Sequence, residues 1–175
     1  MSKMKSKLML AGVLVACAFG EMALSLAWAN GNGATKTTQS VVDFATKSIV
    51  RGESTLTRTD NGITMHLTAT GVEPGAYTGW IPIFGPSGPI VAGRVAGHVV
   101  GEGGELTFTA HLKEGEIISG HPMIPSGSLT DARGQDIGMV VRYHGPADPG
   151  RIYEQTHTFE PGVATDFLFT RHDAP

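Results

Sequence analysis

The chain of 175 residues has a single cysteine, Cys17, which lies in its N-terminal hydrophobic segment. The rest of the chain therefore has no disulfide, no thiolate nucleophile and no thiolate-ligated metal centre, the blue-copper type included. Aromatic residues make up only 7% of the chain and charged residues 17%. Glycine and proline are plentiful, with 24 and 10 residues, and this composition favours many short strands joined by turns over long helices.

Clusters of basic residues are missing after the first few positions. Three of the 13 Lys and Arg residues and one of the 16 Asp and Glu residues lie before Asn30. The remaining chain thus carries ten basic and fifteen acidic side chains, a net charge of −5. Such a chain has no positive patch that could follow a phosphate backbone, so nucleic acid is not expected as a partner.

The N-terminus has the pattern of an export signal. Three lysines among the first seven residues precede the apolar stretch Leu8–Ala18, and Glu21 interrupts its continuation. An apolar core of this length fits a signal peptide and is too short for a membrane span. We therefore expect a periplasmic or extracellular protein with no transmembrane span in its mature form.

Three processing sites fit this signal. Cleavage after Ala29 follows an A-x-A pattern directly before a polar segment, and cleavage after Ala18 follows a second A-x-A pattern. Cys17 also ends a lipobox-like sequence, in which the cysteine would carry a lipid anchor. We expect a signal peptide at residues 1–29, with the other two readings as alternatives.

The mature chain is expected to begin with a flexible segment at residues 30–50 and to continue as one β domain at 51–175. Ser40–Val50 fits a short helix capped by Ser40, although its β-branched residues fit a strand equally well. From residue 51 on, strand patterns alternate with turns. The predicted strands cover 54–59, 63–70, 77–84, 95–100, 105–112, 137–144, 152–159 and 164–171.

These strands predict an all-β fold. Seven or eight short strands at this spacing favour a two-sheet antiparallel β-sandwich, with a small β-barrel as the alternative. Asp60-Asn61-Gly62 predicts a tight hairpin between the first two strands. Pro82 lies within the third predicted strand, which we therefore expect to lie at a sheet edge or to end early.

The stretch Asp136–Gly150 contains the clearest strand, and it ends in a turn rich in proline. Alternation along this strand places Arg142 and His144 on the side opposite its apolar residues. A hairpin with 152–159 would place Glu154 across from Arg142. We expect Arg142 and His144 to bind a ligand.

Histidine is the commonest protein ligand for copper and zinc, and the chain has seven. His66 and His111 lie on the polar sides of their predicted strands and would converge if those strands pair. Together with His144 they form the candidate metal site for copper or zinc. No H-x-H, H-x3-H or H-E-x-x-H spacing supports this site.

Catalytic motifs are missing. Ser87 and Ser126 lie in loops beside prolines, and no G-x-S-x-G sequence is present to expose a nucleophilic serine. The glutamates lie in or near turns and are not paired as glycoside hydrolysis requires. No residue is therefore predicted to be catalytic.

Two segments resemble a family of small exported bacterial proteins. They are GVEPGAYTGW at 71–80 and VVRYHGPA at 140–147, and EQTHTF at 154–159 is similar to a third conserved stretch. The resemblance covers about residues 50–160 and implies export and a β-sandwich. It also draws attention to Arg142, His144, Trp80 and His98 as ligand-binding residues, the last in a glycine-rich strand, GHVVG at 97–101.

The chain departs from this family in one respect. Family members carry cysteines after the tryptophan-containing strand and near the C-terminus, whereas this chain has none there. The resemblance implies no reaction. We thus expect an exported, non-enzymatic binding module for a small ligand or another envelope protein; the alternative is a copper or zinc protein with histidine ligands.

Overall fold

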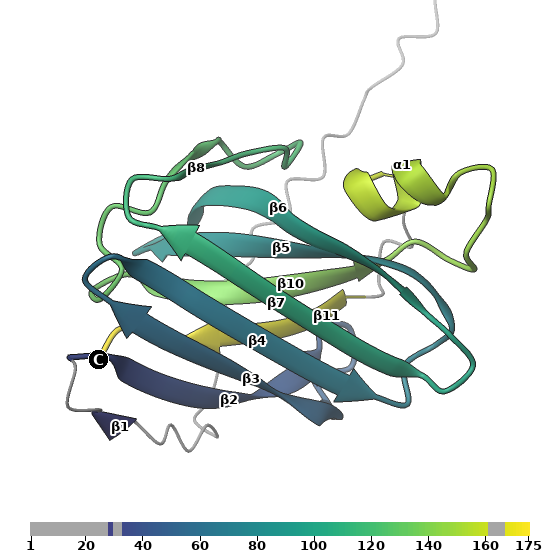
Figure 1. Cartoon of the computed structure of the whole chain (residues 1–175), viewed down its shortest axis with the longest axis horizontal. Helices are drawn as coiled ribbons and strands as arrows, with labels where there is room; N and C mark the ends of the chain where they lie inside the picture. The colour runs from purple at the N-terminus through teal and green to yellow at the C-terminus, as the bar shows by residue number, and fades with distance from the viewer. Residues whose placement is uncertain (1–27, 30–32, 161–166) are drawn as a thin grey trace, which may run out of the picture.

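A computed structural model describes residues 28–29, 33–160 and 167–175 (Figure 1). These residues form an all-β fold with one short helix, which confirms the predicted fold class. Cys17 and Ala18, two of the three processing sites, lie outside the described residues. Ala29 belongs to a two-residue strand, β1 (Trp28–Ala29), which pairs with the first residues of the next strand.

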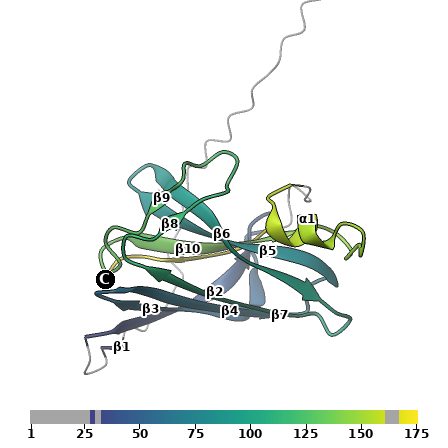
Figure 2. The same ribbon diagram turned by 45° about the horizontal axis from the view of Figure 1, so that its top comes forward.

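Eight strands form one antiparallel sheet in the spatial order β6-β5-β10-β11-β2-β3-β4-β7. Their bounds are β2 (Thr35–Asp43), β3 (Ile49–Thr59), β4 (Gly62–Thr70), β5 (Gly75–Gly85), β6 (Gly88–Val100), β7 (Glu105–Lys113), β10 (Asp136–Tyr143) and β11 (Phe167–His172). A separate two-stranded sheet joins β8 (Ile117–Ile118) to β9 (Gly127–Ser128). Figure 2 shows the two halves of the large sheet facing each other, with β3, β4 and β7 opposite β5, β6 and β10.

The large sheet is continuous, so the predicted sandwich of two separate sheets is corrected to a nearly closed barrel. The strand that joins the halves is β11, which pairs with β10 on one side and with β2 on the other. The barrel stays open between β6 and β7, which are the two ends of the hydrogen-bonded strand order. The sequence pattern could not decide this point, because both architectures need the same alternation.

The core fills the inside of this barrel. Inward-facing side chains alternate with outward-facing ones along β4, β7 and β10, as the sequence predicted. Burial of each large apolar side chain contributes about 1.5–3 kcal/mol to stability. The largest of the fully buried apolar residues inside the barrel are Phe108, Leu56, Met65, Leu67, Ile81, Ile83, Leu106, Leu129, Ile137 and Met139.

The predicted hairpin between β3 and β4 is confirmed. Thr59 pairs with Gly62 across the turn, and Gly62 has φ +140°. A Cβ atom at Gly62 would lie 2.2 Å from the carbonyl oxygen of Leu112 on β7. Glycine is therefore required there both by the backbone conformation and by the close approach of β7.

The short helix expected at 40–50 is wrong. Residues 40–43 are the end of β2, residues 44–48 form the connection, and residues 49–50 begin β3. Val41 is fully buried in the core, and Val42 pairs with Phe169 of β11. The two neighbouring strands supply hydrogen bonds that a helix of this length would have to make alone.

The edge position or early end predicted for the strand with Pro82 is also wrong, because β5 lies between β6 and β10 and continues to Gly85. Proline is tolerated there because the ladder between β5 and β10 is interrupted next to it. Phe84 and Ile83 pair with β10, and pairing resumes only at Trp80. Pro82, which has no N–H to donate, lies in this gap.

The strand predicted at 152–159 is a helix, α1 (Ile152–His157), which lies outside the barrel near β5 and β6 (Figure 1). Gly97 of β6 permits this contact. A Cβ atom at position 97 would lie 2.2 Å from the carbonyl oxygen of Thr156. The buried side chain of Gln155 donates hydrogen bonds to the carbonyl oxygens of His144 and Pro146, and these bonds hold the helix against the end of β10.

Candidate functional site

The outer face of β5 and β10 carries the predicted ligand-binding residues Arg142, His144 and Trp80. In the β5–β10 ladder Arg142 pairs with Thr78, and Val140 pairs with Trp80. The alternate residues of both strands, such as Val141 and Ile81, belong to the core. Arg142 and His144 therefore share the outer face, as the alternation along the strand predicted.

Arg142 is enclosed by groups that follow α1 in the chain. Its side chain is 4% exposed, and its guanidinium lies 4.1 Å from the ring centre of Phe159 and 4.8 Å from that of Phe167. One terminal nitrogen donates to both carboxylate oxygens of Glu160, each at 3.3 Å. Nε is buried and has no acceptor among the described residues.

The positive charge of Arg142 is thus buried beside aromatic rings and is only weakly paired with the Glu160 carboxylate. Burial lowers the pKa of the guanidinium, and the Glu160 carboxylate opposes that effect. Charge-assisted N–H···O bonds are usually about 2.7–2.9 Å long, so both contacts to Glu160 are loose. The Glu160 side chain is 69% exposed, which leaves it free to move away from Arg142.

Thr78 links Trp80 and His144 behind this arginine. The indole Nε1 of Trp80 donates to the Thr78 hydroxyl at 2.8 Å, and the same hydroxyl lies 2.7 Å from Nε2 of His144. A hydroxyl that accepts from an indole still has its own proton to donate, which suits an unprotonated Nε2 on His144. His144 is buried; its ring contacts the Thr78 hydroxyl, and its carbonyl oxygen accepts a hydrogen bond from the Gln155 side chain.

His121 belongs to this site, although the strand pattern did not indicate it. Its Nδ1 accepts backbone N–H bonds from Met123 at 3.2 Å and Ile124 at 3.1 Å, so Nε2 carries the proton. Its ring centre lies 4.5 Å from that of Phe159 and 5.7 Å from that of Trp80. Burial lowers the pKa of His121, and the charge of Arg142 lowers it further, so the ring is neutral near pH 7.

We call Trp80, His121, Arg142, Phe159 and Glu160 the Arg142 cluster. Three aromatic side chains in it meet edge to face or tilted, with Trp80 and Phe159 at 5.3 Å. His121 comes from a loop and Phe159 and Glu160 from the segment after α1, where strand alternation gives no information. Pro122, directly after His121, was the local signal in the sequence, and it indicates only a loop.

The expected pair of Arg142 with Glu154 is wrong. Residues 152–157 form a helix and not the second strand of a hairpin, so Glu154 lies on α1 and pairs with Arg151 at 3.1 Å. The carboxylate near Arg142 is instead that of Glu160.

His98 lies apart from the Arg142 cluster. It is half-buried on β6 opposite Tyr77, and its ring centre is 6.1 Å from that of Phe108, a core residue of β7. Its contacts therefore lie near the open side of the barrel and not on the outer face of β5 and β10.

The structure brings together two of the three histidines of the predicted metal site. His66 on β4 and His111 on β7 are exposed and lie on neighbouring strands. His144 is buried against Thr78 on another part of the barrel. Among the residues that the structure describes, no three or more histidine, cysteine or acidic side chains are grouped to hold a metal ion.

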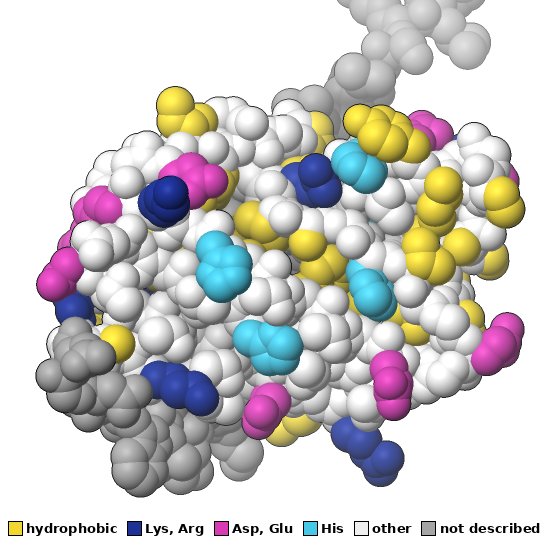
Figure 3. All heavy atoms as spheres, viewed as in Figure 1, with side chains coloured by type: hydrophobic (Ala, Val, Ile, Leu, Met, Phe, Trp, Pro, Cys, Tyr) yellow, Lys and Arg dark blue, Asp and Glu magenta, His cyan; other side chains and the backbone are white. Residues whose placement is uncertain are grey.

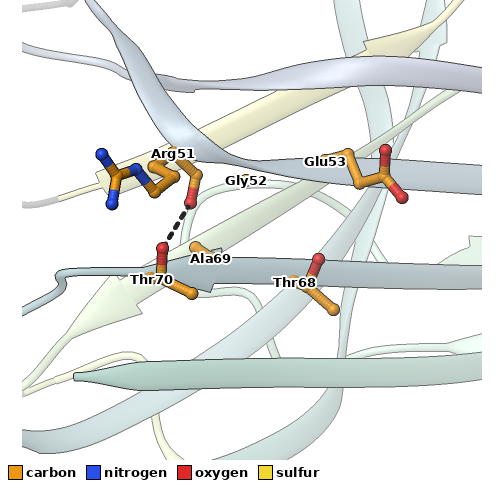
Figure 4. Close-up of a pocket in the computed structure, with 6 residues that line it drawn as sticks. All are labelled: Arg51, Gly52, Glu53, Thr68, Ala69 and Thr70. Carbon is orange, nitrogen blue, oxygen red and sulfur yellow. Dashed lines mark hydrogen bonds between the residues drawn. The ribbon is translucent and has the colours of Figure 1, made fainter. Parts of the chain in front are cut away.

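A shallow depression lies on β3 and β4, apart from the Arg142 cluster. It is lined by Arg51, Gly52, Glu53, Thr68, Ala69 and Thr70. Figure 4 shows that the charged ends of Arg51 and Glu53 point in opposite directions, and the one hydrogen bond drawn joins Thr70 to the backbone of Arg51. No polar groups converge on its centre.

No family model, curated protein or solved structure matches this chain. The functional conclusion therefore depends on the geometry of its own residues. In the described part of the chain, no helix has the length and apolar character needed to cross a membrane.

Proposed function

We propose that the protein is exported and binds a small organic anion, a carboxylate attached to an apolar body, at the Arg142 cluster. The observation that carries this proposal is the buried guanidinium of Arg142, whose one terminal nitrogen makes only loose contacts at 3.3 Å with an exposed glutamate. A buried charge is costly unless it is well paired, so a better-placed anion would bind favourably.

The chemistry of the cluster fits such a ligand. The planar guanidinium can donate two parallel hydrogen bonds to a carboxylate, which point charges such as lysine cannot do. The rings of Phe159 and Trp80, 5.3 Å apart, would contact an apolar body. The Glu160 carboxylate occupies the position that the carboxylate of the ligand would take. These are groups for recognition, and we propose a binding module rather than an enzyme.

Binding of benzoate tests this proposal. In the Trp28→Phe background Trp80 is the only tryptophan, so its fluorescence reports on the cluster. We expect Arg142→Met to weaken benzoate binding at least thirtyfold, or about 2 kcal/mol, because the paired charge is lost. Glu160→Gln should strengthen binding several-fold, because it removes the competing carboxylate.

Two controls make this experiment specific. Arg151→Met removes an exposed arginine that also pairs with a glutamate, and it should leave benzoate binding unchanged. Benzamide has the same shape as benzoate without the charge and should bind weakly. The proposal is wrong if wild-type and Arg142→Met proteins, both folded by circular dichroism, bind benzoate equally, or if Glu160→Gln binds none.

Export is supported by the N-terminal pattern and is tested by sequencing the processed protein. In a bacterial host we expect the extracytoplasmic protein to begin at Asn30, since Ala29 ends the signal. Ala29→Arg should block this processing, whereas Cys17→Ser should leave it unchanged. Incorporation of labelled palmitate that depends on Cys17 would favour lipidation instead, and an unprocessed cytoplasmic protein would contradict export.

A further inference from the structure

We infer that His66 and His111 form an open, two-histidine binding site for a divalent transition metal ion, copper or zinc, on the outer face of β4 and β7. This site is separate from the Arg142 cluster. In the β4–β7 ladder Thr64 pairs with His111 and His66 pairs with Thr109. The two histidines therefore occupy opposite corners of a square whose other corners are threonines.

The threonines orient both imidazole rings. Nδ1 of His111 lies 2.9 Å from the Thr64 hydroxyl, and Nδ1 of His66 lies 2.9 Å from the Thr109 hydroxyl. Histidine ligands characteristically use one ring nitrogen for the metal and the other for a hydrogen bond to a neighbouring group, which fixes the tautomer. Here each Nδ1 lies within hydrogen-bond distance of a hydroxyl, and when Nδ1–H donates to that hydroxyl, Nε2 is left to bind the metal.

The two rings lie within reach of one ion. Diagonal neighbours in an antiparallel ladder have Cβ atoms roughly 7–8 Å apart or less. Figure 3 shows the histidine side chains on this face as separate patches, so a shared ion would lie between the two rings while both threonine bonds are kept. Both side chains are exposed, so an ion can reach the two rings from solvent.

The surroundings decide which ion is favoured. The adjacent outward residues of β3 are Thr55 and Thr57, which pair with His66 and Thr64 and carry no charge. Among the described residues no third histidine, cysteine or acidic side chain is grouped with these two, so the site does not suit calcium or magnesium, which need several oxygen ligands. Two imidazoles suit copper and zinc, with water completing the coordination, and copper(II) should bind more tightly.

The test uses the untagged full-length protein and copper(II) chloride, with calorimetry for affinity and electron paramagnetic resonance for the ligands. We expect one copper ion per chain with nitrogen hyperfine coupling from imidazole. His66→Ala and His111→Ala should each weaken binding at least tenfold and change the coupling. Thr64→Val and Thr109→Val should each weaken binding about tenfold, because they release a ring.

Matched controls separate this site from adventitious copper binding. Thr68→Val and Thr107→Val make the same change at the next pair along the same face, where neither hydroxyl is bonded to histidine, and should have no effect. His157→Ala removes another exposed histidine and should also have no effect. The inference is overturned if neither His66→Ala nor His111→Ala weakens binding, or if His157→Ala weakens it equally.

Discussion

Replacing Arg58 with methionine is expected to lower the free energy of unfolding by about 3–5 kcal/mol. Arg58 lies on β3 and is 0% exposed, which is unusual for an arginine. One terminal nitrogen donates to the carbonyl oxygens of Ala132 and Gln135, at 3.0 and 2.6 Å. The other donates to those of His172 and Asp173, at 3.0 and 3.2 Å.

Arg58 thus connects three parts of the chain that are distant in sequence. It ties the loop before β10 and the end of β11 to β3, and no carboxylate lies within ion-pair distance of it among the described residues. Burial lowers the pKa of Arg58, and the charges of Asp136, Asp131 and Asp173 oppose this shift. Methionine would fill most of the volume but leave four carbonyl groups without their donor.

Urea unfolding followed by circular dichroism measures this effect. Arg51→Met is the matched control, since Arg51 lies on the same strand but is exposed, and its free energy of unfolding should change by less than about 0.5 kcal/mol. Equal midpoints for Arg58→Met and wild type would show that the backbone bonds of Arg58 contribute little. In that case the carbonyls must find other donors in the variant.

The second large effect is a loss of stability at acidic pH. Free energy of unfolding is expected to fall by about 3 kcal/mol between pH 6.5 and pH 4 because of His172 alone. His172 is 0% exposed, and its ring lies between the hydroxyls of Thr37 at 2.8 Å and Ser54 at 3.0 Å. Burial, and then the charge of Arg58, lowers the pKa of His172 to about 4.

The sign of this pH dependence follows from the different proton affinities of His172 in the folded and unfolded chain. The unfolded chain binds a proton at His172 near pH 6.5, whereas the folded chain does so only near pH 4. The stabilisation is therefore complete above pH 6.5, is lost progressively as the pH falls, and changes no further below about pH 4. Asp43 and Asp136, whose pKa values are lowered in the fold, contribute stability that is lost only below about pH 4, so the two effects are separable.

His172→Gln isolates this contribution. Glutamine can still exchange hydrogen bonds with both hydroxyls but does not titrate, so the variant should lose most of the slope between pH 6.5 and 4. At pH 7 we expect it to be less stable by about 1–2 kcal/mol. His111→Gln, at an exposed position, should keep the wild-type slope; a slope in His172→Gln as steep as in wild type would show that other groups cause the acid sensitivity.

Much of the sheet could be predicted from the sequence because its strands obey a local rule. Alternation of apolar and polar residues indicated β4, β7 and β10 nearly to their ends. The same rule placed Arg142 and His144 on one face, and it placed His66 and His111 on outward sides of strands that do pair. Each of these features depends only on residues a few positions apart.

The predictions that failed depend on neighbours distant in sequence. Residues 40–43 form part of β2, which pairs with β11 and β3, and residues 152–157 form α1, which packs closely against β6 at Gly97. His121 and Glu160 lie in irregular segments, so no periodicity could place them beside Arg142. The sequence pattern likewise gave no sign that Arg58 and His172 are buried, since polar residues in strands usually face water.

The sequence by itself determined an all-β domain, its main strands, and the faces on which its arginines and histidines lie, because strand geometry repeats every two residues. Only the tertiary structure decided that the strands form one nearly closed barrel, because β11 joins the two halves of the sheet. It also decided that Arg142 is enclosed by Phe159, Phe167 and a loosely held Glu160. Such contacts depend on chain segments meeting in space, and no local pattern encodes them.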